Sequence, residues 1–155
     1  ALPISPAGLR LHAPNPAELQ ACALIFAAGQ REILPEEAAR WTAAAFPEAV
    51  AGEQVSVATT AAGDVAGFLS LWTADRFVHF LHVRASWRGR GVGRRLLEHA
   101  GRQVDGPLEL KCLLTNTAAL TFYHHLGWVE VERITAAPLP FVRLRQPLQA
   151  TRARP

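Results

Sequence analysis

The chain has 155 residues, of which 50% are hydrophobic and 19% are charged, with a net charge of +3 at pH 7. This composition is typical of a globular protein and excludes an intrinsically disordered chain. We expect a single domain over residues 1–155, large enough to bury a sizeable core. No apolar run of about 18 residues is present, so neither a transmembrane helix nor a membrane partner is expected. The first ten residues lack the pattern of a signal peptide, so secretion is not expected.

The cysteines and histidines show no metal-binding pattern. Cys22 and Cys112 lie far apart without CxxC spacing, and the histidines are scattered. We therefore expect no disulfide framework and no metal, and a reducing cytoplasm is the default location. The sequence pI of about 9.5 favours an anionic partner. Nucleic acid, anionic lipid and a polyphosphorylated cofactor all remain open on this ground.

The first predicted elements are a strand and two helices. Residues 9–14 alternate enough for a strand. A helix follows from Asn15 as N-cap, with Pro16 at its first position and Glu18 placed for a capping box. Its apolar face is expected to carry Leu19, Cys22, Ala23 and Phe26. A second helix is predicted over 35–46, with acidic residues in its first turn.

The rest of the chain alternates strands with two further helices. Residues 54–60 and 65–72 form a predicted hairpin with Gly63 and Asp64 in its turn, and 77–83 is a third consecutive strand. The remaining predicted elements are a helix with Val92, Leu96, Leu97, Ala100 and Val104 on its apolar side, a strand at 108–114, a short helix from Asn116 to Gly127, and strands at 128–134 and 141–148. The tail from about 149 is expected to be frayed. The order β-α-α-β-β-β-α-β-α-β-β predicts a mixed α/β sheet with helices on its faces.

A turn rich in glycine and arginine joins the third strand of this run to the next helix. Gly89, Gly91 and Gly93 let a ligand approach the backbone closely, and the helix N-terminus offers unpaired N–H groups to an anion. The side chains of Arg88, Arg90 and Arg94 can add contacts to phosphate oxygens. The alternative is a flexible connection with solvated charges. The spacing is neither G-x-x-x-x-G-K-S/T nor G-x-G-x-x-G, which excludes a P-loop and disfavours a dinucleotide site.

Two segments together resemble one known family. The run "RGRGVG" at 88–93 resembles the acyl-CoA pyrophosphate loop, Q/R-x-x-G-x-G/A, of the GCN5-related N-acetyltransferase (GNAT) superfamily. The run "NTAALTFYHHLGW" at 116–128 resembles that family's N-x-x-A-x-x-F-Y-x-x-x-G-F signature, with Trp128 in place of the last Phe. The resemblance covers residues 67–128 firmly and earlier residues loosely. It implies the α/β (α+β type) acyl-CoA N-acyltransferase fold, with a mixed, mostly antiparallel sheet of about six to seven strands flanked by four helices.

The resemblance also implies an activity. Enzymes of this superfamily pass an acetyl group directly from acetyl-CoA to an amine, without a covalent enzyme intermediate and without a metal. We therefore expect acetyl-CoA as cosubstrate and a primary amine of a small molecule or peptide as acceptor. A monomer or a homodimer is compatible with this expectation. The identity of the acceptor and the use of longer acyl-CoAs stay open.

The resemblance implies which residues bind the donor. The backbone of 77–83 borders a V-shaped gap next to 108–114, and the N–H of Val83 polarises the thioester carbonyl. The residues implied to contact acetyl-CoA are Leu81, His82, Val83, Arg88, Gly89, Arg90, Gly91, Val92, Gly93, Arg94 and Asn116. Asn116 also has the residue type of a helix N-cap, which is compatible with a contact to the pantetheine arm.

Tyr123 is the candidate general acid. The resemblance implies that it protonates the leaving CoA thiolate, and it lies two helical turns after Asn116, so both can face one slot. The alternative is a core aromatic beside the core residue Phe122. Cys112, flanked by leucines, is interpreted as a buried strand cysteine rather than a nucleophile.

The sequence offers more than one candidate for the general base. Some members of the family have a Glu where this chain has Lys111, and Glu109 lies two residues further back. His79 is the preferred candidate, because the family's aralkylamine branch has a histidine at this position and a histidine is largely neutral at pH 7. Alternation places it on the face of Leu81. One alternative is that His79 is a structural histidine on a half-buried strand, hydrogen-bonded to its neighbours. Another is that a water chain acts as the base.

Three other features give weaker expectations. His82 points to the opposite face and is expected to pack or lie on the surface, while His124 and His125 are expected to be solvated. Acidic residues within 27–53 are consistent with a cationic acceptor, although acids in a first helical turn need no ligand to explain them. A nucleic-acid-binding module is disfavoured, because no exposed aromatic platform accompanies the arginines. An acyl-CoA-binding relative without catalysis stays open.

Overall fold

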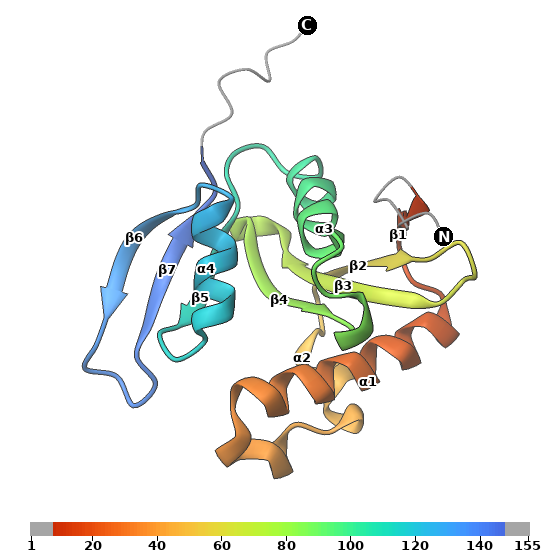
Figure 1. The fold of residues 1–155 in the computed structure, drawn as a ribbon, viewed down its shortest axis with the longest axis horizontal. Coiled ribbons are helices and arrows are strands. Elements are labelled where there is room, and N and C mark those ends of the chain that lie inside the picture. Colours follow the sequence, from red (N-terminus) through yellow and green to blue (C-terminus); the bar gives the residue numbers. More distant parts are fainter. Residues whose placement is uncertain (1–7, 148–155) are drawn as a thin grey trace, which may run out of the picture.

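The computed structural model describes residues 8–147, which contain one seven-stranded sheet in the order β1-β2-β3-β4-β5-β7-β6 (Figure 1). The strands are β1 (Arg10–His12), β2 (Gln54–Thr59), β3 (Val65–Trp72), β4 (Phe77–Val83), β5 (Glu109–Leu113), β6 (Val129–Ile134) and β7 (Phe141–Arg145). All neighbours are antiparallel except β4 and β5, which are parallel. The predicted fold class and element order are confirmed. The tail predicted from about 149 lies outside the described residues.

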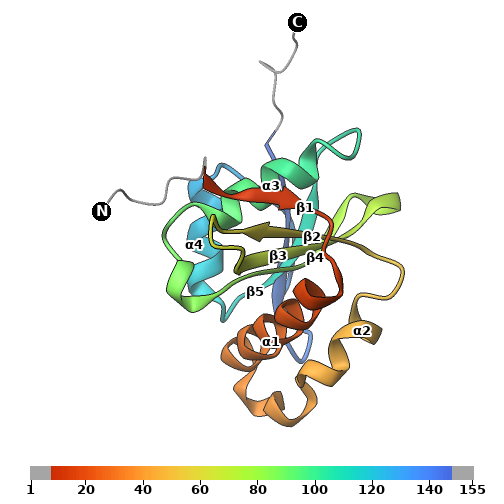
Figure 2. The same ribbon diagram turned by 90° about the vertical axis from the view of Figure 1, so that its right-hand side faces the viewer.

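The α-helices cover both faces of the sheet. They are α1 (Pro16–Ile33), α2 (Phe46–Ala49), α3 (Val92–Gly101) and α4 (Thr117–His125). Figure 2 shows α1 on one side of the sheet and α3 and α4 on the other. Each face has its own cluster of buried apolar side chains, one around Phe26 and Phe68 under α1, the other around Leu69 and Leu96 under α3 and α4.

The first helix begins as predicted, but its buried face differs. Asn15 Oδ1 accepts a hydrogen bond from Glu18 N at 2.8 Å, and Glu18 Oε1 accepts one from Asn15 N at 2.9 Å, which completes the capping box. Cys22 and Phe26 are buried as expected. The prediction for Leu19 is wrong, since it is 37% exposed. It lines an open groove between α1 and residues 43–50 instead of packing against the sheet.

The second predicted helix, over 35–46, does not form as one element. Two short 3-10 segments, Pro35–Arg40 and Ala43–Ala45, precede α2 instead. They are separated by Trp41 and an extended Thr42 (φ −112°, ψ 162°). No residue of the first segment is buried, so no apolar stripe holds a longer helix to the core. Trp41 is the anchor, because its ring packs edge-on against the ring of Phe26.

The helix after the glycine turn is shorter than predicted. It ends at Gly101, a weak helix former, and Arg102 N donates to the carbonyls of both Glu98 and His99. Val104 therefore lies beyond the helix, although its side chain still packs against the core. Within residues 8–147, no helix is both long and apolar enough to cross a bilayer.

Candidate active site

An opening in the sheet lies between β4 and β5. These strands pair only at Phe77–Glu109 and Val78–Leu110, and beyond this point they diverge (Figure 1). A cavity of about 280 Å³ occupies the opening and is lined by both strands, the end of α1, Trp41 and α4. The V-shaped gap predicted between 77–83 and 108–114 is therefore present.

The backbone of β4 faces this gap at alternate residues. Arg84 N donates a hydrogen bond to Ala66 O on β3 at 2.8 Å. Because successive N–H groups of a strand point to opposite edges, the N–H and C=O of Val83 and Leu81 point away from β3, toward the gap. The N–H groups of both residues and the C=O of Leu81 are thus available to an extended ligand, while the C=O of Val83 accepts a hydrogen bond from Arg88 Nε at 3.3 Å.

His82 has a different position. Its ring is 8% exposed, and its Nε2 lies 2.7 Å from Gln30 Oε1 on α1. A Cβ at Gly29 would clash with this ring, so the glycine lets α1 approach β4 closely. Burial, with the nearby Arg88 cation adding to it, lowers the pKa of His82 to about 4. The side chain is therefore neutral at pH 7 and packs against α1. The backbone N–H and C=O of His82 point toward β3 and not toward the gap.

The glycine turn leads into an α3 N-terminus with no side-chain cap among the described residues. Gly89 (φ +75°) and Gly91 (φ +83°) are both left-handed, a conformation that favours glycine. A Cβ at Gly89 would meet nothing within 4 Å, so the turn borders open space. The first backbone N–H groups of α3, which begins at Val92, are therefore available to an anion.

The three arginines predicted to contact phosphate surround this turn but have protein partners. Arg88 lies 2.8 Å from a Glu32 carboxylate oxygen, and its Nε donates to Val83 O at 3.3 Å. The guanidinium of Arg90 lies 4.9 Å from the ring centre of Trp87. Arg94 Nε lies 3.4 Å from Glu98 Oε2. Exposed ion pairs such as those of Arg88 and Arg94 contribute little to stability, so either guanidinium can leave its carboxylate partner and bind another anion.

The fourth helix brings Asn116 and Tyr123 to the cavity. Asn116 Oδ1 accepts a hydrogen bond from Ala119 N at 3.3 Å, as predicted for an N-cap. Tyr123 is 7% exposed and packs between the rings of Phe122 and Trp128, and both Asn116 and Tyr123 line the cavity. Burial raises the pKa of the Tyr123 phenol well above its usual value. The hydroxyl therefore keeps its proton at pH 7.

His79 also lines the cavity, but on a different face from the predicted one. The register of β3 against β4 shifts between Ser70 and Leu71, which leaves His79 without a partner in the ladder. Its ring stacks on the ring of Phe80, with centroids 4.0 Å apart. The two neighbours therefore share one face, and His79 does not share the face of Leu81. The β-bulge resets the alternation on which the prediction rested.

Glu53 is a partner of His79 that the sequence did not reveal. Its carboxylate lies 2.6 Å from His79 Nδ1, and its side chain is only 8% exposed, against 44% for His79. The hydroxyl of Ser70 donates to the other carboxylate oxygen. Because a carboxylate only accepts, Nδ1 carries the proton, and Nε2 keeps a free electron pair. Glu53 follows a left-handed turn at Gly52 (φ +79°), and no motif marks either residue.

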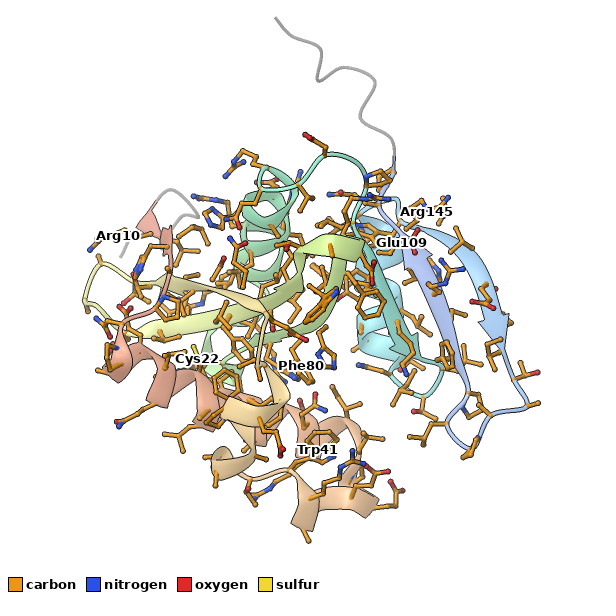
Figure 3. The ribbon with its side chains drawn as sticks, turned by 180° about the vertical axis from the view of Figure 1, so that it is seen from behind. Arg10, Cys22, Trp41, Phe80, Glu109 and Arg145 are labelled. Atoms are coloured by element: carbon orange, nitrogen blue, oxygen red, sulfur yellow. The ribbon has the colours of Figure 1, made fainter. Side chains whose placement is uncertain are left out.

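The other two residues considered for the base position have different surroundings. Glu109 bonds to Arg143 at 2.6 Å and Arg145 at 2.8 Å, and Figure 3 shows it beside Arg145. Desolvation would raise the pKa of Glu109, but the hydrogen bonds from Arg145 and Arg143 outweigh it and lower the pKa. Lys111 lines the cavity, with its Nζ 4.7 Å from the ring centre of Phe141.

The remaining candidates are placed as follows. Cys112 is buried beside the cavity, and burial raises its pKa to about 11, which keeps the thiol protonated and unreactive at pH 7. His124 and His125 are exposed at the end of α4. Among residues 8–147, no group of three or more His, Cys, Asp or Glu side chains could hold a metal ion.

The family model of the acetyltransferase (GNAT) domain matches residues 51–130, just over half of the sequence, and the chain therefore belongs to the GNAT family. This confirms the resemblance of the two motifs. The chain is accordingly an acetyltransferase by family, and the family uses acetyl-CoA. No curated protein matches the sequence significantly.

Solved structures share the fold over nearly the whole chain. A GCN5-related N-acetyltransferase from Rhodopseudomonas palustris is 25% identical, with a TM-score of 0.71 over 96% of this chain and 99% of that one. The ribosomal-protein-S18-alanine N-acetyltransferase of Escherichia coli is 20% identical, with a TM-score of 0.67 over 90% and 93%. The yncA protein of Salmonella typhimurium, solved with acetyl-CoA, is 17% identical, with a TM-score of 0.63 over 95% and 97%. The latter two show the fold alone.

Proposed function

We propose that this chain is a single-domain, acetyl-CoA-dependent N-acetyltransferase that acetylates a primary amine by direct attack. The observation that carries the proposal is the single cavity in the sheet opening, lined by His79 from β4 and Tyr123 from α4. A proton acceptor and a proton donor thus border one reaction space. The buried, free thiols of Cys22 and Cys112 are compatible with a reducing compartment such as the cytoplasm.

The donor fits the α3 and α4 side of the opening. The pyrophosphate is held by the first N–H groups of α3 and by the turn at 88–94, with Arg88, Arg90 and Arg94 available around it. The pantetheine arm lies along Leu81 and Val83 like an added strand, and Asn116 borders it. The N–H of Val83 donates to the thioester carbonyl oxygen, where negative charge develops during attack.

The acceptor must lose a proton before it can attack, because an alkyl ammonium has an ordinary pKa of about 10.4. His79 Nε2 accepts this proton, while Glu53 holds the ring in the required tautomer and stabilises the cation that forms. Glu109 is a poorer base, since two arginines bind its carboxylate. The amine nitrogen then bonds to the carbonyl carbon, the C–S bond breaks, and Tyr123 donates its proton to the leaving sulfur. The second proton of the nitrogen returns the Tyr123 phenolate to its neutral form, and the His79 imidazolium releases its proton to water. The protonated thiol of Cys112 favours direct transfer over an acyl-enzyme.

Donor binding is tested by thermal unfolding with millimolar acetyl-CoA. A ligand at 100 times its Kd adds about 2.7 kcal/mol to the unfolding free energy, and we expect a rise of this order. Gly91→Ala is expected to weaken acetyl-CoA binding by about ten-fold, because a Cβ at φ +83° is strained and displaces the α3 N-terminus.

Gly63→Ala is the matched control. Gly63 has φ +92° in the β2–β3 turn, with nothing near its missing Cβ, so this variant carries the same kind of strain away from the site. It is expected to lose stability and keep acetyl-CoA affinity. A wild-type protein that is stabilised by an oligonucleotide and not by acetyl-CoA would contradict the proposed function.

A further inference from the structure

The two sides of the sheet opening offer different environments to the two substrates. A Cβ at Gly93, in the first turn of α3, would lie 3.3 Å from the ring of Phe122 and 3.8 Å from Val83. The start of α3 therefore lies on the face of the sheet that α4 covers. If the donor binds as proposed above, its phosphates and pantetheine occupy this face. The part of the cavity on the α1 face is then left for the acceptor.

The walls of this acceptor side are apolar. The aliphatic and aromatic residues that line this side are Ile33, Leu34, Trp41, Phe80 and Leu139. Phe80 and Trp41 both pack against Phe26 of α1, and Figure 3 shows them on the same side of the sheet. The buried Gln30 and His82 of this wall are hydrogen-bonded to each other at 2.7 Å, while Trp41 Nε1 is buried without a hydrogen-bond partner among the described residues. The wall therefore solvates an apolar group well and an extra charge poorly.

The charges around the acceptor side of the cavity do not favour an acceptor with a second ammonium group. Among the residues that line the cavity within the described chain, Lys111 is the one with a permanent charge, and it is positive. Glu32 binds Arg88 and Glu37 binds Arg40. The lining of the cavity contains none of the acids of residues 27–53. Glu53 is covered and bonded to His79. A bound polyamine or aminoglycoside would place ammonium groups against apolar walls beside Lys111 without a carboxylate partner.

We propose that the acceptor is a monoamine with an apolar body of aromatic or branched aliphatic character, and that Lys111 selects against acceptors with further positive charges. The single amine is neutralised at His79, so no ammonium has to stay buried while the acetyl group is transferred. The apolar body lies between Trp41 and Phe80. This inference rests on the proposed function.

An acceptor panel at saturating acetyl-CoA tests it, with release of CoA thiol as the rate and the mass of the acetylated amine as proof of product. We expect kcat/KM for 2-phenylethylamine and isoamylamine to exceed that for spermidine and 1,4-diaminobutane by about 100-fold, the ratio typical of an unpaired buried charge. Equal or better acetylation of spermidine would overturn the inference and leave the proposed function intact. Binding of acetyl-CoA without acetylation of any amine would overturn both.

Lys111 variants add a readout specific to charge. Lys111→Glu is expected to lower KM for 1,4-diaminobutane by about ten-fold relative to KM for 2-phenylethylamine, because it replaces repulsion by attraction. Lys111→Met, which only removes the charge, is expected to give an intermediate ratio. Acetyl-CoA affinity, measured by calorimetry in all three proteins, serves as the folding control. The same amine preference in all three proteins would contradict the role of Lys111.

Discussion

Tyr123→Phe is expected to lower kcat by about 100-fold or more, the usual contribution of a general acid, with little change in acetyl-CoA affinity. The substitution removes the hydroxyl that is proposed to donate to the leaving sulfur, and it keeps the aromatic ring. The ring contacts with Phe122 and Trp128 are preserved, so the fold is expected to remain intact. The measurement is kcat by thiol release together with the acetyl-CoA Kd by calorimetry.

Comparing the change in kcat with the change in the acetyl-CoA Kd distinguishes a role of Tyr123 in proton transfer from a role in packing. His124→Gln is the matched control, because His124 is the next residue along α4 and its side chain is exposed. It is expected to behave like the wild type in both measurements. A Tyr123→Phe protein that loses affinity and kcat in the same proportion would remove Tyr123 from the role of acid.

His79→Ala is expected to lower kcat/KM at pH 7 by about 100-fold, because the amine then has no positioned base. The measurement is kcat/KM for one monoamine across the pH range in which the enzyme stays folded. A variant that keeps the wild-type kcat/KM would show that another group is the base.

Glu53→Gln tests whether the carboxylate positions His79. The amide keeps the size of the side chain but no longer stabilises the imidazolium, so we expect kcat to fall by about ten-fold with little change in acetyl-CoA affinity. Glu109→Gln is the comparison, since it removes the other carboxylate considered for the base while leaving the His79 contacts in place. It is expected to change stability through its two arginine pairs and to leave kcat unchanged. The reverse pattern would make Glu109 the base.

The donor side of the site could be predicted from the sequence because its determinants are local. The glycine turn at 88–93 and the helix after Asn116 are continuous segments, and their conformations follow from residue type. The Asn116 N-cap was expected from its residue type, and a Tyr123 that faces the same slot as Asn116 was expected from spacing. The resemblance of the two motifs then linked them to one ligand.

The surroundings of the proposed base could be predicted only in part, because they are not local. His79 was identified by position, but a bulge in β4 moved its side chain to the other face. Glu53 and His79 meet only when β2, β3 and β4 assemble, and neither belongs to a motif. The prediction of one helix over 35–46 was wrong for a similar reason. Local propensity favoured it, and the packing of Trp41 on Phe26 determined the backbone instead.

Direct transfer of the acetyl group is the central claim, and a rapid-quench single turnover with acetyl-labelled CoA and 2-phenylethylamine tests it most directly. The predicted result is that label leaves CoA and appears on the amine at the same rate, with none on the protein at any time. Label that first accumulates on the protein, for example on Cys112, or label that stays on bound acetyl-CoA, would contradict it.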